Sequence, residues 1–286
     1  MSGAPAPSRI AATFARGRED GRAVLIPYMT AGFPDLATSE AVICGLVAGG
    51  ADLIEIGVPF SDPLADGATV QRASQVALGN GVRLADCLDL VHRLRTVHEV
   101  TIPLLFMGYY NPILRYGVEK FAQDAALVSL DGVIVPDLPA EESDDLLAAC
   151  RANGRDLVFL VAPTSTTARI AEVAARASGF IYCVSLTGVT GRRSELPDLT
   201  PYLRRIRELT NLPLAIGFGI STPDHVRHVA AIADGVVVGS ALINALERVS
   251  PAAMPATAEA FIRLLRTGIE RRSPAPALAM ATTTTE

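Results

Sequence analysis

The most informative stretch of the chain reads LIEIGVPFSDPLADG from Leu53 to Gly67. It begins as a short apolar strand that one carboxylate, Glu55, interrupts, and it continues as a loop rich in proline, glycine and aspartate. Because side chains alternate across a strand, Glu55 shares its face with Leu53 and not with Ile54. A carboxylate buried in an apolar strand costs free energy unless the protein pairs it or uses it. The stretch therefore predicts a strand end that carries acid–base chemistry, with Asp66 close enough to Glu55 to share one cavity.

Apolar runs typical of strands alternate with amphipathic helical patterns on both sides of this stretch. The predicted strands are Val24–Met29, Asp52–Ile56, Pro103–Met107, Gly132–Val135, Leu157–Val161, Phe180–Val184, Leu214–Ile216 and Gly235–Val238. The predicted helices are Leu36–Ala48, Ala85–His98, Val118–Ala126, Glu141–Ala152, Thr167–Ala177, Tyr202–Leu209, Pro223–Ala231 and Met254–Ile269. Eight strands, each followed by a helix, predict an α/β fold of the (β/α)8 TIM-barrel type. A doubly wound open sheet is the alternative, but it rarely needs eight such regular units.

The two ends of the chain lie outside this alternation. We expect Ile10–Arg18 to form a helix that caps the bottom of the barrel. The tail from Ser273, rich in proline, alanine and threonine, is predicted to be disordered. No linker divides the rest, so residues 1–272 are predicted to form a single catalytic barrel domain and residues 273–286 the tail.

Composition excludes several classes of protein. The net charge of −5 gives little support for a nucleic-acid surface. Four scattered cysteines without CxxC spacing, no apolar run of 18 residues and no signal pattern indicate a cytoplasmic protein. The four histidines form no metal site, so no metal is expected. Lys120 is the only lysine among 25 basic residues, so a mechanism that needs a catalytic lysine would have to use it.

The residues that follow the strands are the candidates for function, because TIM-barrel active sites lie at the C-terminal strand ends. Glu55 could be neutralised by an arginine in the core, but no predicted strand contains one. We expect burial to raise the pKa of Glu55 toward neutrality, which suits a group that gives and takes a proton. Spacing alone leaves Asp66 open between a functional role and an N-cap of a helix over Gly67–Leu78. For Asp62, an ordinary role on the loop surface is favoured.

Glycine-containing turns follow the last three predicted strands, at residues 187–191, 217–221 and 239–240. Barrels commonly bind phosphate after strands seven and eight through backbone N–H groups and a short helix, although simple tight turns remain the alternative. Apolar residues near the strand ends could wall a pocket, although each alone is more often core: Tyr28, Met107, Tyr182 and Phe218. The residues therefore favour a phosphorylated substrate with an apolar end, handled by carboxylates without a metal or a Schiff base.

These motifs closely resemble the signature of the tryptophan synthase α subunit family. The resemblance rests on EIGVPFSDPLADG at residues 55–67, YYNP at 109–112, VPDLP at 135–139, GVTG at 188–191 and GFGIS at 217–221. It covers roughly Ile10 to Gly268, and the first motif is long and specific. The resemblance implies a carbon–carbon lyase that cleaves indole-3-glycerol phosphate to indole and glyceraldehyde 3-phosphate by a retro-aldol reaction.

The resemblance also implies roles for individual residues. Glu55 would do the acid–base work, and Asp66 would hydrogen-bond the indole N–H and stabilise positive charge on the ring. The residues implied to wall the indole are Tyr28, Met107, Val133, Tyr182 and Phe218. Those implied to hold the phosphate are Gly191, Gly219, Gly239 and Ser240. Thr190 would hydrogen-bond Asp66 when its loop closes.

A partner follows from the same resemblance. The α subunit docks on a β subunit that carries pyridoxal phosphate, in an αββα heterotetramer, and indole passes between them through a tunnel. The residues implied to face the partner are Pro59, Asp62, Pro63 and Asn111, and no cofactor is expected on this chain itself. The alternatives are a stand-alone indole-3-glycerol phosphate lyase and a non-catalytic regulatory subunit. Indole-glycerol phosphate synthase is less favoured, because Lys120 does not lie at a strand end.

Overall fold

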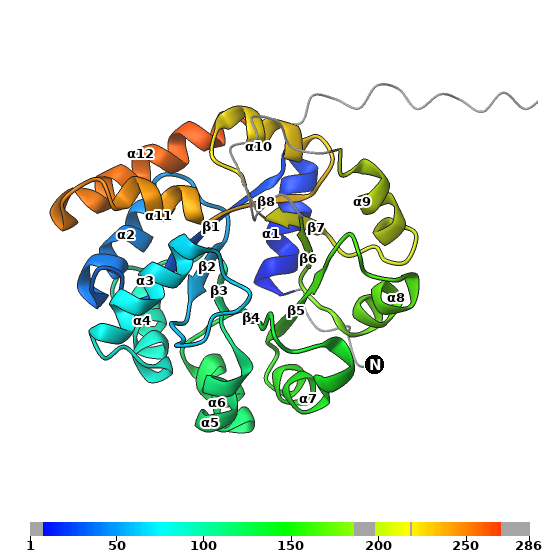
Figure 1. The fold of residues 1–286 in the computed structure, drawn as a ribbon, viewed down its shortest axis with the longest axis horizontal. Helices are drawn as coiled ribbons and strands as arrows, with labels where there is room; N and C mark the ends of the chain where they lie inside the picture. The colour runs from blue at the N-terminus through cyan, green and yellow to red at the C-terminus, as the bar shows by residue number, and fades with distance from the viewer. Residues whose placement is uncertain (1–7, 186–197, 218, 270–286) are drawn as a thin grey trace, which may run out of the picture.

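Eight parallel strands close into a barrel in the order β1 to β8, and helices surround them (Figure 1). This computed structural model describes residues 8–185, 198–217 and 219–269. The strands are β1 (Val24–Thr30), β2 (Ile54–Gly57), β3 (Leu104–Met107), β4 (Gly132–Ile134), β5 (Asp156–Val161), β6 (Ile181–Val184), β7 (Leu214–Gly217) and β8 (Gly235–Val238). The closed barrel confirms the predicted (β/α)8 fold. The tail predicted to be disordered, residues 273–286, lies outside the described residues.

The predicted helices are all present, with ends that lie within three residues of the prediction, and one further helix was not predicted. The helices are α1 (Arg9–Glu19), α2 (Leu36–Ala48), α3 (Ala68–Gly79), α4 (Leu84–Thr96), α5 (Tyr110–Tyr116), α6 (Val118–Leu127), α7 (Asp144–Ala152), α8 (Thr167–Arg176), α9 (Thr200–Arg207), α10 (Pro223–Ala230), α11 (Ser240–Leu246) and α12 (Met254–Arg266). Short 3₁₀ turns occupy Ala140–Glu142 and Pro251–Ala253, so α7 begins later than predicted. Helix α5 was not predicted; its Pro112 stands in the first turn, where the missing N–H is tolerated.

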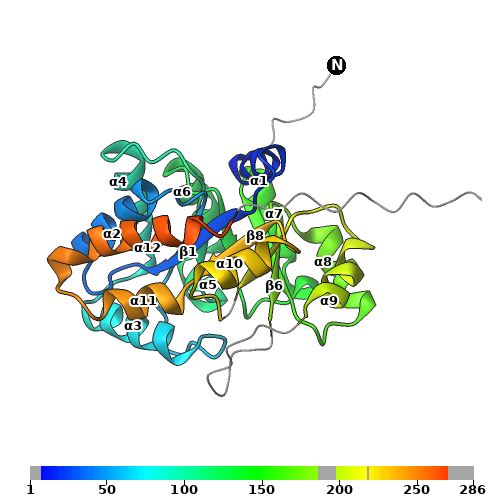
Figure 2. The ribbon, with the colours of Figure 1, turned by 90° about the horizontal axis from the view of Figure 1, so that it is seen from above.

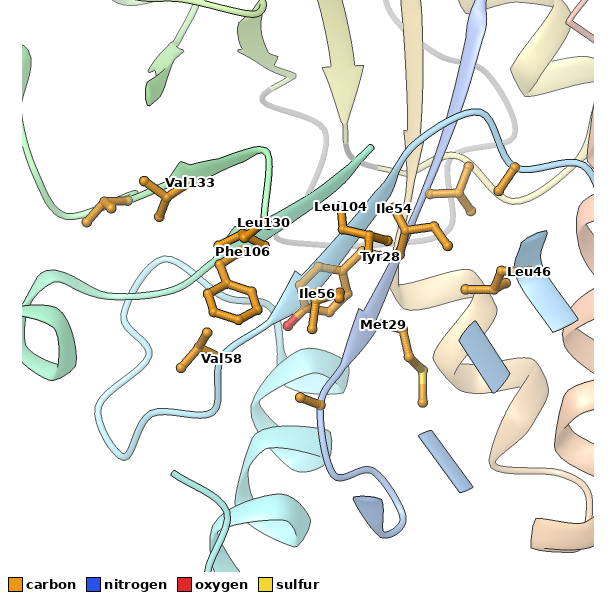
Figure 3. Packing of buried hydrophobic residues seen from close by; sticks show 14 of the residues in the cluster. Tyr28, Met29, Leu46, Ile54, Ile56, Val58, Leu104, Phe106, Leu130 and Val133 are labelled. Atoms are coloured by element: carbon orange, nitrogen blue, oxygen red, sulfur yellow. The ribbon is translucent and has the colours of Figure 1, made fainter. Parts of the chain in front are cut away.

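Side chains of the strands divide into two buried layers. One layer fills the barrel interior and includes Leu53, Leu105 and Val237. The other lies between the sheet and the helices, and Figure 3 shows part of it, including Ile54, Ile56 and Phe106. Glu55 stands between Ile54 and Ile56 in β2 and therefore points to the interior, as the alternation predicted.

Helix α1 closes the N-terminal end of the barrel. Its Ile10 and Phe14 belong to the interior cluster, and the Phe14 ring lies 5.3 Å from that of Phe180. Figure 2 shows α1 at the end of the barrel opposite the loop that leads into α3. The prediction of a capping helix at the bottom of the barrel is confirmed, and the C-terminal strand ends are left for the site.

A repeated pair of hydrogen bonds joins the N-terminal ends of alternate strand pairs. The Asp131 N–H donates to the Leu104 carbonyl at 2.9 Å, while the Leu104 N–H donates to the Asp131 carboxylate at 2.8 Å. Equivalent pairs of bonds join Leu25 with Asp52, Leu157 with Ser178, and Leu214 with Asp234. Arg95 pairs with the buried Asp131 carboxylate at 2.6 Å. These bonds fix the strand registers on which the geometry of the opposite end depends.

The described structure bears on two of the compositional predictions. All four cysteines are free. Within residues 8–185, 198–217 and 219–269, no helix is long and apolar enough to span a membrane.

Candidate active site

A cavity of about 520 Å³ lies at the C-terminal ends of the strands. Its size falls within the range of about 300–1,000 Å³ that is usual for small-molecule sites. The strands contribute Tyr28, Glu55, Met107, Tyr182 and Val237, the loop before α3 contributes Ala65, Asp66 and Gly67, and the loops after β7 and β8 contribute Gly219, Ile220, Ser221, Gly239 and Ser240. The structure thus brings both candidate carboxylates to the wall of one cavity, as the sequence predicted.

Glu55 is a fully buried carboxyl group in β2. Register places it beside Tyr28 on β1 and Leu105 on β3. Its side chain is 0% exposed, and within the described part of the chain neither carboxylate oxygen has a hydrogen-bond partner. Burial raises the pKa of Glu55 to about 8, because the apolar surroundings penalise the charged form. Glu55 is therefore protonated at neutral pH, and its proton is available to a molecule in the cavity.

Asp66 is a half-buried carboxylate at the end of the loop that leads from β2 to α3. The N-cap of α3 is Gly67, which makes no side-chain capping bond, so the helix-cap interpretation of Asp66 is not supported. Burial raises the pKa of Asp66 to about 6, while a hydrogen bond from the Tyr109 side chain acts in the opposite direction. Asp66 is therefore mainly ionised at pH 7, unlike Glu55. The cavity holds one protonated and one ionised carboxyl group.

Two tyrosines flank the carboxylates, and each lies across a glycine of the neighbouring strand. A Cβ atom at Gly57 would lie 2.0 Å from the Tyr28 hydroxyl oxygen, and one at Gly217 would lie 2.0 Å from that of Tyr182. Glycine is therefore required at both positions to make room for the rings. Burial raises the pKa of both tyrosines, so they remain neutral. The sequence showed the aromatic residues but not their pairing with glycines.

The far side of the cavity offers backbone groups suited to an anion. Gly219 follows β7 with φ of +75°, a conformation that favours glycine. Gly239 follows β8, and α11 begins at Ser240, so its first N–H groups lie at the cavity wall. Three of the four residues predicted to hold phosphate thus line the cavity. The fourth, Gly191, lies outside the described residues.

The structure contradicts one predicted wall residue. Val133 pairs in register with Phe106, and both belong to the layer between the sheet and the helices. Figure 3 shows both residues in that cluster. Val133 therefore points away from the cavity, because neighbours in register face the same side of a sheet. Met107 does line the cavity, whereas Thr190 and Phe218 lie outside the described residues.

Several cavity residues were missed by the sequence analysis. Asn244 and Arg248 line the cavity together with Val70 of α3 and Phe261 of α12. Their signal was weak: Asn244 lies one helical turn after Ser240 in α11, and Arg248 lies just beyond the end of that helix. In the sequence, Tyr109 stands out only as the first residue of the YYNP motif. Its interaction with Asp66 joins residues that are 43 positions apart, so no local pattern reveals it.

The residues implied to face a partner differ in exposure. Asp62 and Asn111 are exposed, and Pro63 is partly exposed, whereas Pro59 is buried and offers no free surface. Leu64, which adjoins Asp62 and Pro63, is 95% exposed. The loop before α3 therefore presents an apolar side chain to solvent beside two of the predicted contact residues.

Comparisons with known proteins agree with this geometry. The family model described as "Tryptophan synthase alpha chain" matches residues 14–267. The tryptophan synthase alpha chain of Chloroflexus aurantiacus is 52% identical over 265 residues, which cover 92% of this chain and 99% of the relative. That of Geobacter sulfurreducens is 48% identical over 263 residues, with coverage of 92% and 99%.

Solved structures give the same result. A structure of Mycobacterium tuberculosis tryptophan synthase superposes with a TM-score of 0.85 at 38% identity and covers 93% of this chain and 100% of the matched chain. The structure of tryptophan synthase subunit alpha from Legionella pneumophila also has a TM-score of 0.85, at 37% identity, with coverage of 92% and 99%.

Proposed function

The chain belongs to the tryptophan synthase alpha chain family, and we propose that it cleaves indole-3-glycerol phosphate to indole and glyceraldehyde 3-phosphate, which makes it a carbon–carbon lyase. The observation that carries this proposal is the buried Glu55 carboxyl group, which has no partner in the described structure and faces a cavity shared with Asp66. Such a group suits a reaction in which one side chain both gives and takes a proton.

Glu55 supplies the proton transfers. The bond between indole C3 and the side chain breaks only when C3 gains a proton and the adjacent hydroxyl loses one. Protonated Glu55 donates its proton to C3, and the resulting carboxylate takes the hydroxyl proton as the bond breaks. The bonding electrons return to the ring, the side-chain carbon becomes the aldehyde, and Glu55 regains its proton. Its raised pKa of about 8 suits both directions of transfer.

Asp66 stabilises the charge that this step creates. Protonation at C3 places positive charge on the ring, and the ring N–H becomes a stronger donor. An ionised Asp66 accepts that N–H bond and stabilises the charge in a site from which water is largely excluded. The closed position proposed for Thr190, next to Asp66, would add a hydrogen bond to the same carboxylate.

The remaining wall sets what the cavity accepts. Tyr28, Met107 and Tyr182 offer an apolar surface to the indole ring, and we assign Phe218 to the same wall. Gly219, Gly239 and Ser240 offer backbone donors to the phosphate, and we add Gly191 on the family resemblance. The proposal needs no cofactor on this chain, since Glu55 can perform both proton transfers. The four free cysteines fit a reducing, cytoplasmic compartment.

The pH dependence of kcat/KM is expected to be bell-shaped. Asp66 must be ionised, so activity rises as the pH passes upward through its pKa of about 6. Glu55 must be protonated at the start, so activity falls as the pH rises through its pKa of about 8. Initial rates of indole release, measured from about pH 5 to about pH 9, test this. A rate that continued to rise above about pH 8 would contradict Glu55 as the proton donor.

A partner subunit is the second part of the proposal. The family implies a β subunit, and we propose an αββα heterotetramer in which that subunit holds pyridoxal phosphate and receives the indole. The exposed Asp62 and Asn111, the partly exposed Pro63 and the exposed Leu64 would contact it. A partner that favours the closed site raises the active fraction by its differential affinity for that state.

Activity of the purified chain with and without a β subunit tests both parts. We expect slow indole release from indole-3-glycerol phosphate by the chain alone, a marked increase on addition of a β subunit, and a complex detectable by its mass. Asn111→Ala should weaken complex formation, whereas Asp89→Ala, an exposed change on α4, should not. High activity without a complex would favour a stand-alone lyase. No cleavage under either condition would overturn the proposed function.

A further inference from the structure

The loop that carries Asp66 is held by Tyr109, a residue that does not itself take part in the proposed proton transfers. Tyr109 is the N-cap of α5 and is 5% exposed. Its hydroxyl oxygen accepts the Ala65 N–H at 2.8 Å. The same hydroxyl interacts with the Asp66 carboxyl group and lowers its pKa, in opposition to the larger effect of burial. A hydroxyl has one proton, so the acceptor role toward Ala65 leaves that proton for Asp66. One phenol thus fixes the backbone before Asp66 and interacts with the Asp66 side chain.

The Tyr109 ring is itself held in place. It stacks on Phe60 with a centroid distance of 5.0 Å and an angle of 28° between the ring planes. Gln71 Nε2 donates to the Asp66 carbonyl at 2.9 Å, which holds the same loop from α3. The loop around Asp66 therefore has a side-chain contact from the β3–α5 connection and another from its own helix. The backbone on both sides of the Asp66 side chain is therefore held in place.

We propose that Tyr109 is a positioning residue that holds the loop of Asp66, and with it the Asp66 carboxylate, at the cavity wall. This inference rests on the proposed function, since it concerns how Asp66 acts in it. It also links the site to α5, which begins next to Tyr109 and carries the exposed Asn111. A partner bound at α5 would then act on Asp66 through one side chain.

The charges around Asp66 are consistent with this role. Tyr28 and Tyr182 interact with Asp66 electrostatically but remain neutral, because burial raises the pKa of each. Glu55 is protonated at pH 7 by the same cause, and Arg248 lines the cavity from the end of α11 while being exposed to solvent. Burial and the charge of Asp66 raise the pKa of the Tyr109 phenol, and the nearby Asp137 acts in the same direction. The Tyr109 hydroxyl favours the ionised form of Asp66, because it lowers the pKa of that carboxyl group.

Tyr109→Phe in the full chain tests the proposal, because it keeps the ring and its stacking and removes the hydroxyl. Because the variant loses an interaction with a charged group, we expect its kcat to fall about tenfold to a hundredfold near neutral pH. Loss of the bond raises the pKa of Asp66, so the acid limb of the pH profile should move up by about one to two units. The loss should therefore be larger at about pH 6 than at about pH 8.

Tyr116→Phe is a matched control. The Tyr116 hydroxyl donates to Asp124 at 2.6 Å, a tyrosine–aspartate pair between α5 and α6 that does not line the cavity. We expect this variant to keep the wild-type rate and pH profile. Thermal unfolding of both variants checks that each remains folded.

Two results would overturn the proposal. One is an unchanged rate in Tyr109→Phe. The other is a lower rate with an unmoved acid limb, which would make Tyr109 a packing residue only. Titration of the Asp66 carboxyl by carbon-13 NMR, without substrate, measures its pKa in both proteins independently of activity. The two proposals can fail separately. If the pKa of Asp66 rises in Tyr109→Phe but the wild-type chain cleaves no substrate, the proposed function is wrong and the role of Tyr109 stands.

Discussion

Replacing Glu55 with glutamine is expected to abolish turnover while the substrate still binds. Glutamine has nearly the shape of the protonated glutamic acid, so the cavity should keep its form, but an amide can neither give nor take the proton. Positioned acid–base groups contribute about 10²- to 10⁴-fold to rate, and the loss of kcat should be of that size or larger. Rapid-quench measurement of indole release gives kcat, and calorimetric titration with substrate gives binding.

The same substitution should stabilise the fold at neutral pH. The pKa of Glu55 is about 8 in the native state against 4.5 for an ordinary solvent-exposed glutamate, so the unfolded chain ionises first as the pH rises. Stability from this group is therefore complete below about pH 4.5 and is lost as the pH rises toward 8. Glutamine does not ionise, so the variant does not lose stability as the pH rises. Its free energy of unfolding at pH 7 should therefore exceed that of the wild type by on the order of a few kcal/mol.

The control is Glu119→Gln, an exposed glutamate on α6, which should change neither rate nor stability. Turnover by Glu55→Gln within about tenfold of wild type would remove Glu55 from the proton transfers. Equal stability of Glu55→Gln and wild type at pH 7 would instead contradict the raised pKa.

Replacing Asp66 with asparagine is expected to lower kcat by about 10²- to 10³-fold, the usual effect of losing one preorganised electrostatic group. Asparagine can still accept the indole N–H through its carbonyl oxygen, but it carries no charge to oppose the positive ring. The effect should therefore fall on kcat more than on KM. The acid limb near pH 6 should also vanish from the pH profile, because the group that produces it is gone.

Steady-state rates across pH provide the measurement, and Asp89→Asn on the exposed face of α4 is the control. Full activity of Asp66→Asn would show that the charge is not needed. If the pH profile of Asp66→Asn still showed an acid limb near pH 6, another group would be responsible for that titration. Because α3 is capped by Gly67 without a side-chain bond, loss of helix capping cannot account for a reduced rate.

The sequence by itself determined the barrel and the identity of the carboxylates. Strand and helix periods are local properties, and a regular alternation of eight units leaves few other topologies. Glu55 was recognisable because a lone carboxylate in an apolar strand is costly wherever that strand packs. The exposure of loop residues was harder to predict than the strands and helices. Pro59, which the resemblance implied to face a partner, is buried beside the strand that it follows.

Only the tertiary structure decided how the parts of the site meet. Val133 sits in a strand of three residues, too short for its pattern to show which face it presents, and its register with Phe106 turned it outward. The fit of Tyr28 over Gly57 and of Tyr182 over Gly217 depends on which strands are neighbours. The contact of Tyr109 with Asp66 depends on two loops that converge only when the barrel closes. Such contacts join distant positions, and no local period encodes them; the sequence therefore determines which groups are present, and the closed barrel determines which of them touch.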